Sequence, residues 1–133
     1  MPRDYFRAMT PTEGERPVLG ANKRALGALA NETTDITGTF GPGTGGMSVS
    51  PDSPWFVPHH RRPRGMGRGS TGPVQDWIFA IGDPALDSAS LSARLDPQSP
   101  ERHAFIEPVT RLTFGDYNAA LAATQAAWRR FWP

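Results

Sequence analysis

The sequence contains no cysteine, which excludes disulfide bonds, thiol nucleophiles and thiolate metal ligands. It also lacks an apolar run long enough to cross a membrane, and its first residues lack the charged-then-apolar pattern of a signal peptide. We therefore expect no membrane partner. Export, if it occurs, would need a specialised secretion route.

The sequence also lacks a large excess of positive or negative charge, since its formal net charge is only +1. No overall field is available to recruit nucleic acid or an anionic membrane. The positive charge is local, and four arginines and two histidines lie between His59 and Arg68. The histidines at 59, 60 and 103 lack the spacing of metal ligands, so we expect no metal site.

Long helices should also be few, because the 133 residues include 14 glycines and 14 prolines. The length fits a single domain over residues 1–133, and a hydrophobic content of 38% is enough for an ordinary core. The composition therefore predicts a loop-rich α+β domain.

Alternating and apolar runs predict the strands, and capping residues with helical spacing predict the helices. Strands are expected at 4–9, 35–37, 47–50, 75–81 and 103–109, with a short helical turn and a further strand between Leu86 and Leu95. Helices are expected from Asn22 to Leu29 and from Thr113 to Trp132, the second being amphipathic. The segment 55–72 has aromatic, basic and glycine residues without periodicity, which predicts a loop.

Four polar residues on these strands are candidates for a site. Arg7 lies on the first strand, Ser48 and Ser50 share one face of a middle strand, and Glu107 ends a late strand before a proline. Each also has a plain structural interpretation: a surface-reaching arginine, an edge strand with a polar face and a solvated glutamate.

These residues carry a resemblance to a known family. The segments Tyr5-Phe-Arg-Ala, Gly46-Met-Ser-Val-Ser and Phe105-Ile-Glu-Pro, in that order, resemble the Arg–Ser–Glu arrangement of the ADP-ribosyltransferase fold. The wider pattern is similar to small ADP-ribosyltransferase-like toxins exported by type VI secretion systems. The resemblance implies an α+β fold in which two small packed antiparallel sheets form an NAD cleft, with a C-terminal amphipathic helix and long loops.

The resemblance also implies roles for individual residues. Arg7 would bind the phosphates or the adjoining ribose of NAD, and Ser48, supported by Ser50, would contact nicotinamide. Glu107 would be catalytic, stabilising the positive charge on the ribose as nicotinamide leaves. The aromatic side chains that could stack on nicotinamide are Tyr5, Trp55 and Phe105.

The same resemblance implies partners and a location. A toxin of this kind acts in the cytoplasm of the producer or the target bacterium, is neutralised by a cognate immunity protein, and modifies a macromolecular acceptor. Arginine-modifying toxins carry Glu or Gln two positions before the catalytic glutamate, in the patterns Glu-x-Glu and Gln-x-Glu, whereas this sequence has Phe105 there. The acceptor of ADP-ribose is therefore left open, and it could be water or a group other than arginine.

The alternative is a noncatalytic binding module. The basic loop Arg61–Arg68, beside Trp55 and Phe56, could engage RNA or an acidic protein by charge and stacking. The low net charge makes nucleic acid the less favoured partner. If the chain is an enzyme, the longer segment Trp55–Arg68 is the candidate for contacting the target or gating the cleft.

Overall fold

The computed structural model describes residues 2–133 and contains one six-stranded sheet with the order β4-β5-β2-β1-β3-β6, in which every neighbouring pair is antiparallel. The expected α+β class is therefore confirmed, but the sheet is single where two packed sheets were expected. The strands are β1 (Asp4–Met9), β2 (Met47–Pro51), β3 (Trp77–Gly82), β4 (Leu91–Leu95), β5 (Ala104–Pro108) and β6 (Arg129–Trp132).

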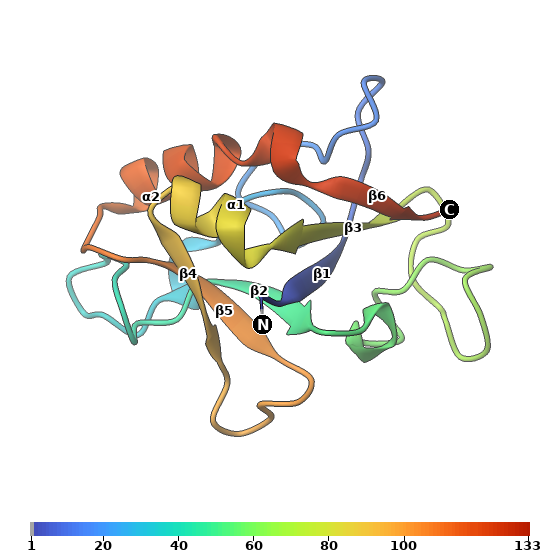
Figure 1. Cartoon of the computed structure of the whole chain (residues 1–133), viewed down its shortest axis with the longest axis horizontal. Helices are drawn as coiled ribbons and strands as arrows, with labels where there is room; N and C mark the ends of the chain where they lie inside the picture. The colour runs from blue at the N-terminus through green and yellow to red at the C-terminus, as the bar shows by residue number, and fades with distance from the viewer. Residues whose placement is uncertain (1) are drawn as a thin grey trace.

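Within residues 2–133, two α-helices and three single-turn 3-10 helices complete the fold. The α-helices are α1 (Asp83–Ser88) and α2 (Phe114–Ala122), and the 3-10 helices are η1 (Ala30–Glu32), η2 (Pro54–Phe56) and η3 (Gln125–Ala127). Both α-helices lie on the same side of the sheet (Figure 1). In the part of the chain that is described, no helix has the length and apolar character to cross a membrane.

The core has two parts, one on each side of the sheet. Leu86 of α1 and Leu121 of α2 pack with apolar strand residues such as Met47 and Ile106 in the larger cluster. Phe6 and Ile78 belong to the smaller cluster, which the loop after η2 covers with Val57 and Met66. The segment expected to be an irregular loop is therefore partly anchored in the core.

The contact between β1 and β2 is short. Only Tyr5 with Pro51 and Phe6 with Ser50 are in register, whereas β1 pairs with β3 along all six of its residues. The half made of β4, β5 and β2 is thus joined to the half made of β1, β3 and β6 by one brief ladder. Beyond Phe6, the space between the two central strands is available for other groups.

The prediction of a helix from Asn22 to Leu29 is wrong, because the backbone of this segment forms hydrogen bonds with other parts of the chain. The Leu26 amide donates to the carbonyl of Val18 at 2.7 Å, and the carbonyl of Ala25 accepts from the Arg7 guanidinium at 3.0 Å. A helix would use these groups internally. The segment forms turns instead, as does 35–37, where a strand was expected.

The C-terminal helix begins where the sequence indicates and ends early. The Thr113 hydroxyl accepts a hydrogen bond from the Asp116 amide at 3.2 Å, which is the expected N-cap. The helix stops at Ala122, and residues 129–132 form β6 against β3. The aromatic spacing at the end of the chain suits a strand as well as a helix, and the open edge of β3 takes it up.

Candidate functional site

A pocket of about 270 Å³ opens where the β1–β2 ladder ends. Its walls come from both central strands, from the turns between β1 and β2, and from the loop that follows η2. The lining residues are Phe6, Arg7, Ala8, Lys23, Glu32, Ser48, Val49, Ser50, Val57, Pro58, Arg61 and His103. Three of the residues singled out from the sequence, Arg7, Ser48 and Ser50, therefore meet at one place.

Arg7 reaches the pocket from β1 and is only 8% exposed. Its guanidinium donates four hydrogen bonds to backbone carbonyls, two to Ala25 and one each to Ser48 and Asn22. A guanidinium has five N–H donors, so one remains for a ligand. Burial lowers the pKa of Arg7 to about 10, which still leaves the side chain charged at neutral pH.

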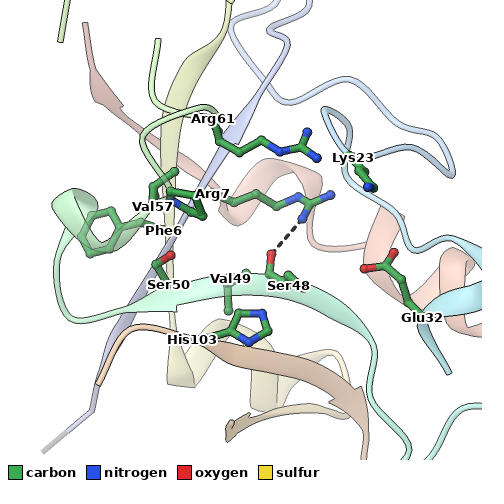
Figure 2. A pocket seen from close by; sticks show the side chains of 12 residues that line it. Phe6, Arg7, Lys23, Glu32, Ser48, Val49, Ser50, Val57, Arg61 and His103 are labelled. Atoms are coloured by element: carbon green, nitrogen blue, oxygen red, sulfur yellow. Dashed lines mark hydrogen bonds between the residues drawn. The ribbon is translucent and has the colours of Figure 1, made fainter. Parts of the chain in front are cut away.

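Arg61 extends beside Arg7, with both guanidinium groups turned the same way, and Lys23 approaches from the opposite wall (Figure 2). Arg61 is close enough that its charge contributes to the lowered pKa of Arg7. Among the described residues, neither Arg61 nor Lys23 forms an ion pair with a carboxylate. The pocket thus holds positive charge that no protein carboxylate pairs, which is the electrostatic pattern of an anion site.

Ser48 and Ser50 follow the alternation of β2, whose other two residues in this stretch, Met47 and Val49, belong to the larger core cluster. The backbone carbonyl of Ser48 accepts a hydrogen bond from Arg7 at 2.8 Å, which ties β2 to β1 where their ladder has ended. Neither the Ser48 hydroxyl nor the Ser50 hydroxyl forms a hydrogen bond with another described residue. Both hydroxyls can therefore serve a ligand.

Glu107 does not line this pocket. Its carboxylate accepts hydrogen bonds from the amides of Gly43 at 3.0 Å and Gly45 at 2.8 Å, and it forms an ion pair with Arg94 at 3.0 Å. The side chain is buried beneath the glycine loop before β2. Glu107 still lies on a strand adjacent to that of Ser48, because Ser48 is in register with Phe105.

The three aromatic candidates also lie outside the pocket lining. The Tyr5 hydroxyl donates to Asp83 at 2.8 Å, and burial raises the pKa of this phenol. Trp55 is half exposed and carries the guanidinium of Arg62 over its ring. Phe105 contacts the guanidinium of Arg94. Each ring is used in packing within the protein.

Sequence reasoning missed two charged residues of the pocket. Lys23 and Glu32 lie in segments without regular periodicity, and only the tertiary structure brings them to the serine strand. Arg61 was expected at a cleft, as part of the basic loop, and it does line the pocket. His103 lines it too, with its ring Nδ1 2.8 Å from the carboxylate of Asp96. Within the described residues, no group of three or more histidines and carboxylates is arranged to hold a metal ion.

No protein-family model, curated protein or solved structure matches this chain. The function is therefore inferred from the pocket and from the residues that build it.

Proposed function

We propose that the protein is an ADP-ribosyltransferase-like enzyme that binds NAD in this pocket and cleaves its bond between nicotinamide and ribose. ADP-ribose would pass to water or to an acceptor. The observation that carries the proposal is the pair of neighbouring guanidiniums, Arg7 and Arg61, beside the two free hydroxyls of Ser48 and Ser50. Phosphate groups would neutralise the positive charge of the two guanidiniums, and the serine hydroxyls would form hydrogen bonds with the uncharged parts of a nucleotide.

The pyrophosphate of NAD would lie against Arg61 and the remaining N–H donor of Arg7. Arg7 is already fixed by its four carbonyl contacts, so little side-chain entropy is lost when it binds. The nicotinamide end would lie along β2, where the serine hydroxyls are available. Val57 and Phe6, which line the pocket, provide the apolar surface for the rings.

The arrangement of the strands supports the same proposal. Arg7 is on β1, Ser48 and Ser50 are on β2, and Glu107 is on β5, which are three consecutive strands in the sheet. In the proposed fold the cleft lies between two small sheets, and in this chain the two halves of the single sheet would take their place. The short ladder between β1 and β2 gives the space for such a cleft.

Action as a bacterial toxin, delivery by a type VI secretion system and neutralisation by an immunity protein are part of the proposal, supported by the sequence resemblance. The toxin would act in the bacterial cytoplasm, where NAD is present. Growth arrest on expression in bacteria, relieved by the Ser48→Ala change, is the behaviour that this part of the proposal expects.

The test is nicotinamide release from NAD by the purified protein, with the Michaelis constant compared between two arginine variants. Arg61→Ala removes a pocket cation, and Arg64→Ala removes an exposed cation of the same loop that does not line the pocket. Losing a charged hydrogen bond costs about 1.5–3 kcal/mol, so Arg61→Ala should raise KM by about 10-fold or more. Arg64→Ala should stay within about twofold of the wild type, because exposed charges contribute little.

A protein that releases no nicotinamide under any condition would contradict the proposal. The noncatalytic alternative would then apply if RNA or an acidic protein bound with a strong salt dependence. Arg64 and Arg68 are the appropriate residues for charge reversal in that case, since both are exposed. Arg62 is less suitable, because it donates to the carbonyls of Trp55 and Val57 within the loop.

A further inference from the structure

Glu32, at the end of η1, is the only carboxylate among the described residues that line the pocket. Its side chain points toward Arg7 and Ser48 from the wall opposite Arg61 (Figure 2). We propose that Glu32 is the catalytic carboxylate, which stabilises the positive charge that develops on the ribose of NAD. This inference rests on the proposed function and assigns its acidic group to a residue that the sequence motifs do not indicate.

The electrostatic position of Glu32 suits that role. Its charge favours the protonated form of Arg7, so the two groups are near one another. Within residues 2–133, however, Glu32 forms no ion pair with Arg7 or with any other cation. A negative group therefore faces a positive group across the pocket without contact. A ligand with phosphates at one end and a developing cation at the other matches this separation.

The backbone around Glu32 holds the carboxylate in place. One carboxylate oxygen, Oε1, accepts a hydrogen bond from the Leu29 amide at 2.6 Å. Oε2 has no hydrogen-bond partner among the described residues and is free to bond a ribose hydroxyl. The Glu32 carbonyl also lies against Gly45, where a Cβ would come within 2.7 Å of it. Only glycine allows this close approach of the two segments.

Glu107 is less suited to act on the ribose directly. Both of its oxygens are engaged by the amides of Gly43 and Gly45 and by Arg94. To reach a ligand it would have to give up these bonds in a buried place, which costs free energy. Its visible effect is to hold the glycine loop that packs against Glu32.

The chemical step needs no group beyond NAD and a nucleophile. The bond between the anomeric carbon of ribose and the nicotinamide nitrogen breaks, and both electrons leave with the nitrogen, which loses its positive charge. The ribose becomes an oxocarbenium-like cation, which the Glu32 carboxylate stabilises. Water or an acceptor then bonds to the anomeric carbon, and its proton passes to solvent. Because this charge is largest in the transition state, the carboxylate acts on kcat more than on binding.

The experiment compares nicotinamide release and NAD affinity for the wild type, Glu32→Gln, Glu32→Asp and the control Glu13→Gln, which makes the same chemical change on an exposed hairpin. Glutamine can still accept the bond from Leu29, so the fold should be kept. We expect Glu32→Gln to lower kcat by about 10²–10³-fold, as for other transition-state charge stabilisers, with the NAD dissociation constant within about threefold. Glu32→Asp should recover part of the rate, and Glu13→Gln should match the wild type.

The outcomes separate the two proposals. If the wild type releases nicotinamide and Glu32→Gln stays within about threefold in kcat, the role of Glu32 is overturned and the proposed function stands. The same conclusion follows if Glu32→Gln loses NAD binding in parallel with activity, or if only Glu107→Gln lowers kcat in a folded protein. If the wild type releases none, both proposals fail. Thermal unfolding of each variant shows whether it is folded.

Discussion

At the scale of single residues, Arg7 is the best defined member of the site. It was expected to bind phosphates, and its guanidinium does lie in a pocket, but four of its donors hold backbone carbonyls. Arg7 therefore holds the segments that form the pocket together, and it also gives the pocket positive charge. Replacement by alanine would leave the carbonyls of Ala25 and Ser48 without this donor, so such a variant tests folding more than binding.

The charge of Arg7 gives a pH dependence for ligand binding. Burial, and after it the charge of Arg61, lower the pKa of Arg7 to about 10. The protonated form binds phosphate, so NAD affinity should be constant between about pH 7 and 9 and should fall as the pH rises through about 10. Titration calorimetry across this range is the measurement.

A control separates Arg7 from the other groups that could lose protons there. The pKa values of Tyr5 and Tyr117 are raised by burial, so neither phenol ionises in this range. A Lys23→Gln variant removes the pocket lysine and should keep the fall in affinity. An affinity that stays constant to pH 11 would show that the Arg7 charge does not contact the ligand.

The residues of the site differ in how far the sequence could predict them. Ser48 and Ser50 stand on a strand whose sequence alternates, which indicates that they share a face, and Arg7 stands in a short aromatic segment that predicts a strand. Glu32 stands in a 3-10 turn between irregular segments, and no periodic signal places it. Glu107 was placed correctly on its strand, but the sequence cannot show which donors would surround its carboxylate.

At the scale of elements, the glycine loop before β2 and the strand β5 form one unit through Glu107. The carboxylate accepts from two loop amides and pairs with Arg94 of β4, so it joins three segments. Tyr117 of α2 adds a second link, since its hydroxyl donates to the carbonyl of Ile106 and accepts from the Met47 amide. This unit holds β2, whose residues Ser48 and Ser50 line the pocket.

Glu107→Gln should weaken that unit. The amide nitrogen of glutamine cannot accept a hydrogen bond, so one of the two loop amides loses its acceptor in a buried place. Arg94 loses its ionic partner at the same time. We expect the free energy of unfolding to fall by about 1–3 kcal/mol, measured by urea denaturation.

Glu101→Gln is the matched control, because Glu101 is exposed on the turn before β5 and should change stability by less than about 0.5 kcal/mol. Equal midpoints for Glu107→Gln and the wild type would show that Glu107 does not hold the loop.

The elements that the sequence predicted well are those whose signal is local. The strand 4–9 and the Thr113 cap depend on neighbouring residues and are confirmed. The prediction of a helix from Asn22 to Leu29 was wrong because Arg7, distant in the sequence, binds two carbonyls of this segment. The predicted end of the C-terminal helix was wrong because residues 129–132 pair with the edge of β3. Both errors come from tertiary contacts that override local preference.

At the scale of the whole molecule, the structure has one six-stranded sheet where two packed sheets were expected. The sheet has two three-stranded halves with a weak central junction, and the charged pocket lies at this junction. Helices cover one side of the sheet, and the loop after η2 covers part of the other and supplies Arg61 (Figure 1). The overall architecture therefore brings residues from distant parts of the sequence to one opening.

The most direct test of the central claim is a crystal structure of the Glu32→Gln variant with NAD. We predict that the pyrophosphate lies against Arg7 and Arg61, and that the bond between nicotinamide and ribose lies between Ser48 and the residue at position 32. NAD bound elsewhere, or bound here with its nicotinamide end against Arg61 and its phosphates remote from Arg7, would contradict it.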